Sequence, residues 1–170
     1  MATQRFYRVQ SGWSFTCYSE EHEFQARGHY CMDYSHWLNR GKFERHLDWD
    51  DRSREPSPFI SVYDSWQEAQ TRARVLTQRR HPDVFIAEIL LSSPQEKILD
   101  VGFSDLTVHL PTLQQVRDDT GGPATTFVSI SAVRKYLRVG HTGDTRASEW
   151  FALDSVPNDL IVKKWQRGAQ

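Results

Sequence analysis

The sequence is poor in cysteine and balanced in charge. Its 170 residues include two cysteines, and 21 basic residues stand against 22 acidic ones, which gives a net charge of −1. Cysteine at this density does not build a disulfide framework, and neither Cys17 nor Cys31 lies in a Cys-x-x-Cys pair, so we expect two ordinary thiols. The charge balance gives no reason to expect a nucleic-acid groove or an anionic membrane as the main partner.

Long apolar runs are also missing. The first residues lack the apolar core of a signal peptide, and no stretch approaches the length that spans a bilayer. We therefore expect no membrane contact and a cytoplasmic location, with secretion or delivery by another route left open. No change in composition marks a linker, so residues 1–170 are expected to form a single domain. The sequence does not predict an oligomeric state.

What the sequence does contain is organised around residues 56–65. Two prolines favour an extended approach, and the aromatic and β-branched residues 59–63 predict a strand. Ser65 and Glu68 form a capping box at the start of a helix. Ser61 places a small hydroxyl in the middle of the apolar strand, where it is useful if that strand faces a cleft.

The helix after this strand has the clearest periodicity in the chain. Its apolar positions are Trp66, Ala69, Ala73 and Leu76. Arg79 and Arg80 are expected in the last turn, where cations complement the helix dipole. The following His81-Pro82 ends the helix.

Shorter patterns predict the remaining elements. Strands are expected at residues 5–9, 84–91, 98–101, 147–153 and 159–164, and helices at residues 30–38, 112–119 and 131–139, the last with Val133, Tyr136 and Leu137 as apolar contacts. Residues 84–91 are almost continuously apolar, which predicts a strand buried on both faces.

Histidines are frequent in the first third of the chain, at positions 22, 29, 36 and 46, near aspartates at 48, 50 and 51. No spacing among them places two ligands on one face of a helix, so we expect no metal site. His46 approaches the strand at residues 59–63 along the chain and is expected to line the same cleft.

Two charged residues within predicted strands have open interpretations. Arg8 shares a strand face with Phe6, and it either extends from an edge strand into solvent or points into a cleft to bind an anion such as phosphate. Glu149 opens a strand whose other inward positions, Phe151 and Leu153, are apolar. It is either an edge charge in solvent or a functional carboxylate at the mouth of a pocket.

The order of these features resembles a known class of enzymes. Tyr7-Arg8-Val9, Pro58-Phe59-Ile60-Ser61 and Ser148-Glu149-Trp150-Phe151 are similar to the three motif strands of the Arg-Ser-Glu, cholera-toxin-like ADP-ribosyltransferases, a class with many secreted toxins and effectors. This resemblance implies an α+β fold with split, mostly antiparallel β-sheets flanked by helices. The chain also looks similar, over most of its length, to an uncharacterised domain family found mainly in fungal proteins.

The first resemblance implies a mono-ADP-ribosyltransferase that uses NAD as a substrate and modifies a protein or nucleic-acid acceptor. Glu149 would be the catalytic carboxylate, bonded to the nicotinamide ribose and offsetting charge in an oxocarbenium-like transition state. Arg8 would bind the phosphates of NAD and their ribose, and Ser61 would orient Glu149 and the ribose. Tyr63 and His46 complete the expected NAD-binding residues.

Departures from the family pattern keep other functions open. Val62 and Tyr63 follow Ser61 where the family usually has two small hydroxyl residues, and Ala147 stands where members that modify arginine carry Glu or Gln. Arginine is therefore not the expected acceptor. An NAD glycohydrolase on the same fold and a catalytically inactive binding module remain alternatives. The loop at residues 140–146 corresponds by position to the family's acceptor-recognition loop, or is a plain connecting turn.

Overall fold

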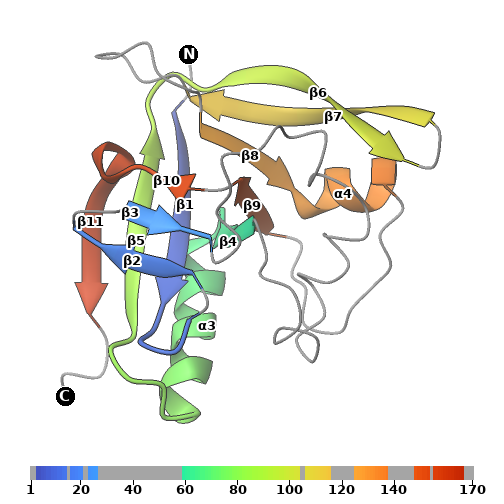
Figure 1. Cartoon of the computed structure of the whole chain (residues 1–170). Coiled ribbons are helices and arrows are strands. Elements are labelled where there is room, and N and C mark those ends of the chain that lie inside the picture. Colours follow the sequence, from blue (N-terminus) through green and yellow to red (C-terminus); the bar gives the residue numbers. More distant parts are fainter. Residues whose placement is uncertain are drawn as a thin grey trace.

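A large antiparallel sheet forms the body of the protein in the computed structural model (Figure 1). The structure describes residues 3–14, 16–20, 23–26, 59–103, 106–115, 125–137, 148–153 and 155–166. Several expectations lie outside these residues: the helix at 30–38, the prolines at 56 and 58, Cys31, His46, Ala147 and the loop at 140–146.

Within the described residues the sheet has eight strands in the order β11-β5-β1-β4-β9-β8-β7-β6. These strands are β1 (Gln4–Gln10), β4 (Phe59–Tyr63), β5 (Phe85–Leu91), β6 (Gln95–Phe103), β7 (Leu106–Gln115), β8 (Thr125–Ser129), β9 (Glu149–Leu153) and β11 (Ile161–Gln166). A smaller sheet contains β2 (Cys17–Ser19), β3 (Glu23–Gln25) and β10 (Ser155–Val156). The helices are α3 (Trp66–Gln78), α4 (Ile130–Leu137) and the 3-10 turn η2 (Asn158–Leu160). The expected α+β class with mostly antiparallel strands is confirmed.

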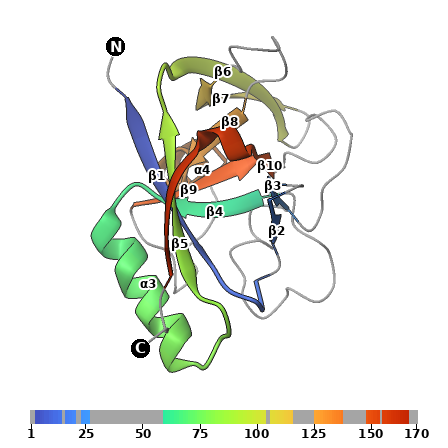
Figure 2. The ribbon, with the colours of Figure 1, turned by 90° about the vertical axis from the view of Figure 1, so that its left-hand side faces the viewer.

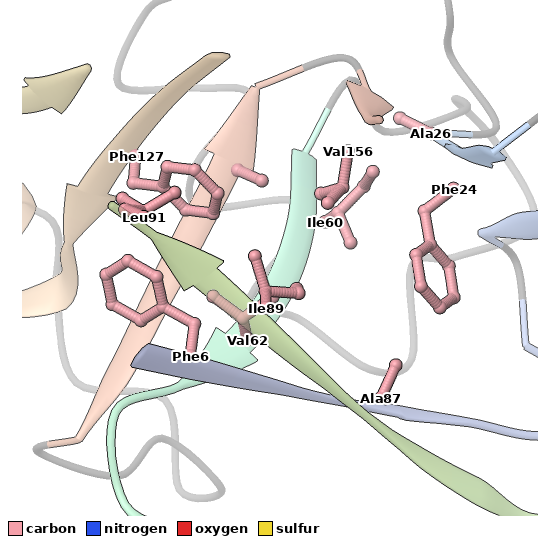
Figure 3. Close-up of a cluster of buried hydrophobic side chains, with 11 residues drawn as sticks. Phe6, Phe24, Ala26, Ile60, Val62, Ala87, Ile89, Leu91, Phe127 and Val156 are labelled. Atoms are coloured by element: carbon pink, nitrogen blue, oxygen red, sulfur yellow. The ribbon is translucent and has the colours of Figure 1, made fainter. Parts of the chain in front are cut away.

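The large sheet is the middle layer of the molecule. Side chains alternate between its two faces, and the apolar clusters follow that alternation. On one face Tyr63 packs with Ala69 and Ala73 of α3, and Phe59 packs in the cluster that contains α4. On the other face the small sheet covers the cluster that includes Ile60, Val62, Phe24 and Val156 (Figure 3). Figure 2 shows α3 and the small sheet on opposite sides of the large sheet.

The large sheet is strongly curved toward the small one. Phe6 of β1 and Phe127 of β8 are stacked with their ring centroids 4.8 Å apart (Figure 3). In a flat sheet, strands three positions apart are separated by roughly 14 Å. The two rings meet because the sheet curls around the buried cluster, and Trp150 contacts Phe6 from the same side at 5.0 Å.

The start of α3 confirms the sequence prediction. The hydroxyl of Ser65 accepts a hydrogen bond from the Glu68 backbone at 3.3 Å, and Ala69, Ala73 and Leu76 are the buried positions of the helix. The prediction that Arg79 and Arg80 lie in the last turn is wrong, because the last helical residue is Gln78.

Arg79 and Arg80 instead belong to the C-terminal cap of α3. His81 N donates to Leu76 O and Arg80 N donates to Thr77 O, both at 3.0 Å. This is the bonding pattern of a Schellman motif, in which the residue after the C-cap is left-handed and usually glycine. Arg80 occupies that position with φ of 63°. A residue with a bulky side chain therefore adopts a left-handed backbone conformation that favours glycine.

Other boundaries differ from the predictions because pairing between distant strands decides them. Residues 112–115 were expected in a helix but lie in β7, where Leu113 pairs with both Glu96 of β6 and Phe127 of β8. The strand predicted at 98–101 is the longer β6. The last strand starts at Ile161 because η2 precedes it. Tyr136 was expected in the core but is exposed on α4. Among the described helices, none combines the length and apolar character needed to cross a membrane.

The cap of α3 gives a testable prediction. Arg80→Gly should raise the free energy of unfolding by about 1 kcal/mol, because glycine adopts a left-handed conformation without a Cβ clash. Arg79→Gly is the matched control, since Arg79 has φ of −82° and gains no such relief. Urea unfolding monitored by circular dichroism measures both, and equal effects of the two substitutions would contradict a strained Arg80.

Candidate functional site

The three residues that carry the resemblance to ADP-ribosyltransferases lie on three neighbouring strands. Arg8 is on β1, Ser61 on β4 and Glu149 on β9, and these strands are consecutive in the large sheet. The register pairs Ser61 with Phe151 and Tyr63 with Glu149. Ser61 and Glu149 are therefore diagonal neighbours on one face, at a backbone separation of roughly 7–8 Å.

Strands β1 and β4 share fewer paired residues than the neighbouring strand pairs in this part of the sheet. Strand β1 pairs with β5 along its whole length, and β4 pairs with β9 along its whole length. Between β1 and β4, the described residues give a single pair, Tyr7 with Tyr63. We call this place the β1–β4 junction. Beyond it, the two strands no longer continue their regular ladder.

The guanidinium of Arg8 crosses the β1–β4 junction. Its Nη1 donates to the backbone carbonyl of Ser61 at 2.9 Å, while Nε and Nη2 donate to Oε1 of Gln10 at 3.0 and 2.9 Å. Gln10 Nε2 in turn donates to the carbonyl of Thr16 at 2.6 Å. Arg8 and Gln10 are both buried. Because β1 lies between β5 and β4, Arg8 does not extend into solvent from an edge strand.

The side chain of Arg8 approaches Ser61 from the opposite face of the sheet. Strand alternation places Arg8 with Phe6 and Val62, on the face covered by the small sheet. The side chains of Ser61 and Glu149 belong to the face of the two helices. Arg8 therefore contacts the backbone of Ser61 at the junction.

Glu149 is a buried carboxylate, 7% exposed, directly opposite Tyr63. Burial, the largest cause, and the charge of Glu149 together raise the pKa of Tyr63 to about 12, while Arg72 and Arg8 act in the opposite direction. The phenol is therefore neutral over the physiological pH range. The burial also shows that Glu149 is not a charge at a solvated edge.

Both neighbours of Glu149 in the sequence, Ser148 and Trp150, are bonded to Asp64. Asp64 N donates to Ser148 O at 2.9 Å, which extends the pairing of β4 with β9 past Glu149. Trp150 Nε1 donates to Asp64 Oδ2 at 3.2 Å. In the described part of the chain, the buried hydroxyl of Ser148 has no hydrogen-bond partner. An unpaired buried hydroxyl costs about 1–3 kcal/mol, so this group beside Glu149 gains from a polar ligand.

Two helices flank the polar positions on their face of the sheet. Phe59 and Phe151 pack in the cluster of α4, and Tyr63 packs in the cluster of α3. Ser61 lies between Phe59 and Tyr63 along β4, and Glu149 is paired with Tyr63. Figure 1 shows β4 and β9 between α3 and α4. The arrangement presents a hydroxyl and a carboxylate between two apolar blocks.

Two expected parts of the site lie outside the described residues. His46 was expected to bind NAD, and it lies outside the described residues together with the loop at 140–146. Among the residues that the structure does describe, no three histidine, cysteine, aspartate or glutamate side chains gather as a metal site would require.

Sequence reasoning missed Gln10 and Asp64. Gln10 stands two positions after Arg8, so the two-residue period of a strand places both on one face, and this relation was visible in the sequence. Asp64 was visible only as the residue between the strand and the cap of α3. Its contact with Trp150 depends on the pairing of β4 with β9, which no local pattern reveals.

The chain matches a known family of protein domains. A family described as a domain of unknown function, DUF7587, matches residues 1–169. The chain belongs to this family. No match was found to a curated protein or to a solved structure. Membership of the DUF7587 family assigns no activity, so the function is argued from the site.

The buried pair of Arg8 and Gln10 gives a second prediction. Gln10→Leu removes the acceptor of two guanidinium N–H groups and the donor to Thr16, and it should lower the free energy of unfolding by about 2–4 kcal/mol. Gln4→Leu, on the same strand, is the matched control, because the side chain of Gln4 bonds only its neighbour's carbonyl at an exposed position. Urea unfolding compares the two, and similar losses would show that Gln10 does not brace Arg8.

Proposed function

We propose that this protein is a mono-ADP-ribosyltransferase that transfers ADP-ribose from NAD to a macromolecular acceptor other than arginine. The observation that carries the proposal is the placement of Arg8, Ser61 and Glu149 on consecutive strands, with Arg8 bonded to the Ser61 backbone and Glu149 buried beside Tyr63. Buried charged residues of opposite sign, built into rigid strands, are a frequent feature of catalytic sites. The narrow β1–β4 junction is also consistent with the split sheet that the resemblance implies.

Each residue has a role in the proposed reaction. The bond between the nicotinamide nitrogen and the ribose C1 breaks, and nicotinamide leaves with the bonding electrons. The positive charge that grows on the ribose is stabilised by the carboxylate of Glu149, which accepts a hydrogen bond from the 2′-hydroxyl. The acceptor then bonds to C1 and loses a proton.

Ser61 and Arg8 would act around this carboxylate. Ser61 lies diagonally to Glu149 on the same face and would orient it and the ribose. Arg8 would contribute its positive charge to binding the phosphates at the junction. The hydroxyl of Ser148, which has no partner among the described residues, offers one more hydrogen bond beside Glu149.

A second candidate function is a catalytically inactive binding module. Val62 and Tyr63 stand where ADP-ribosyltransferases of the Arg-Ser-Glu class usually have two small hydroxyl residues. Both are buried in the apolar core. In addition, three of the N–H groups of Arg8 bond to groups within the fold. Both observations describe a scaffold in which residues expected to bind NAD also stabilise the protein.

Release of nicotinamide from NAD tests the proposal. The wild-type protein, supplied with a cell lysate, should release nicotinamide, and Glu149→Gln should lower the rate by about 100-fold or more, because it removes charge stabilisation in the transition state. Glu96→Gln, at an exposed position of β6, is the matched control and should leave the rate unchanged.

The acceptor separates the related outcomes. Tagged NAD should label a macromolecule in the lysate only when the active protein is present. Release without lysate and without labelling would assign an NAD glycohydrolase to the same site. Absence of release in every condition, from a protein that unfolds cooperatively, would contradict both enzymes and favour the binding module.

A further inference from the structure

The connection from β1 to β2 contains a turn that is held by its own side chains. Residues 11–14 form this element, which we call the 11–14 turn. Ser14 N donates to Ser11 O at 3.1 Å, and Ser11 N donates to Ser14 Oγ at 2.9 Å. Trp13 N donates to Ser11 Oγ at 3.2 Å. Ser11 is buried, so the base of the turn belongs to the interior.

The 11–14 turn is also bonded to the segment that follows α3. Gly12 N donates to Pro82 O at 2.7 Å, and Ser11 Oγ forms a hydrogen bond with His81 Nδ1 at 3.0 Å. A Cβ atom at position 12 would lie 2.9 Å from Cγ of Pro82, so the close approach requires glycine. Both connections lie at the same end of the large sheet (Figure 1). The turn is therefore rigid and has one position relative to α3.

This rigid turn exposes a tryptophan. The side chain of Trp13 is 60% exposed, whereas the other described tryptophans are half-buried. Its ring lies 4.9 Å from the ring of His81. Trp13 bonds to the turn through its backbone N–H, so the turn does not need an indole at this position. A tryptophan on a rigid base loses little conformational entropy when a partner covers it.

Two arginines adjoin His81, the residue whose ring contacts Trp13. Arg79 and Arg80 directly precede His81, and both are exposed. Arg80 keeps its side chain at the left-handed position of the α3 cap, where glycine would relieve strain. Asp83, also exposed, is the acidic residue of the same connection. A strained arginine next to His81, which contacts the exposed tryptophan, is understandable if the side chains of Arg80 and Trp13 both bind something.

We propose that Trp13, Arg79 and Arg80 form a docking surface for an acidic protein segment that carries an apolar side chain. Tryptophan and arginine are the residue types most enriched at the energetic centres of protein interfaces. The apolar side chain covers the indole and the carboxylates pair with the arginines, which gives charge complementarity. A nucleic acid fits less well, because single strands need an extended basic groove with several stacking residues, and this chain has a net charge of −1.

A displayed library of random peptides provides the probe. Selection on the intact wild-type protein should enrich peptides that combine Asp or Glu with an aromatic or large aliphatic residue. These peptides should bind at least about tenfold more weakly to Trp13→Ala and to the double variant Arg79→Gln, Arg80→Gln. Tyr136→Ala, which alters another exposed aromatic residue on α4, is the matched control and should bind them as the wild type does.

Three results would overturn the proposal. One is a selection without an acidic consensus, and another is equal binding of the peptides by Trp13→Ala and the wild type. The third is tighter binding of a fluorescent oligothymidylate than of the peptides. The thermal midpoint of Trp13→Ala should stay within about 2 °C of the wild type, because the indole is mostly exposed and loses only a surface contact with the ring of His81. The test does not use NAD, so its outcome is independent of the proposed transferase activity.

Discussion

The bond from the Arg8 guanidinium to the Ser61 carbonyl is the constraint on which the candidate site depends. Regular pairing joins β5 to β1 and β4 to β9, but β1 and β4 share one pair in the described residues. The buried guanidinium of Arg8 connects β1 to β4 where their pairing ends, and Gln10 orients this guanidinium. A buried ion that is hydrogen-bonded on several sides has little freedom to move, because breaking one bond leaves an unpaired charge. The part of the sheet that ends with β1 and the part that begins with β4 are thereby kept in one relative position.

The layers on either side of the sheet explain why polar groups survive at its centre. The small sheet closes one face over an apolar cluster (Figure 3), and α3 and α4 each close part of the other face. Along β4, Ser61 lies between Phe59 of the α4 cluster and Tyr63 of the α3 cluster, and Glu149 is paired with Tyr63. The neutral Tyr63 beside Glu149 and the cationic Arg8 on the far side of the junction give this region a mixed electrostatic character. Such a mixture suits a reaction in which charge develops on a sugar.

The sequence predicted the elements that local patterns determine. The capping box at Ser65, the apolar face of α3 and the strands that contain Arg8, Ser61 and Glu149 depend on neighbours within a few residues. The sequence did not predict that β1 lies between β5 and β4, nor that residues 112–115 form a strand, because Leu113 takes its conformation from partners on β6 and β8. The cap of α3 was misplaced for a related reason. Its left-handed residue is Arg80, and an arginine at that position gives no local indication of a helix end.

We propose that NAD binds across the strands β1, β4 and β9. An NMR titration of the isotopically labelled protein with NAD tests this directly, because backbone amide shifts report which strands a ligand touches. We expect shifts concentrated at and beside Arg8, Ser61 and Glu149, with the β6–β7 hairpin unchanged. Absence of shifts at millimolar NAD, or shifts confined to strands away from the β1–β4 junction, would contradict it.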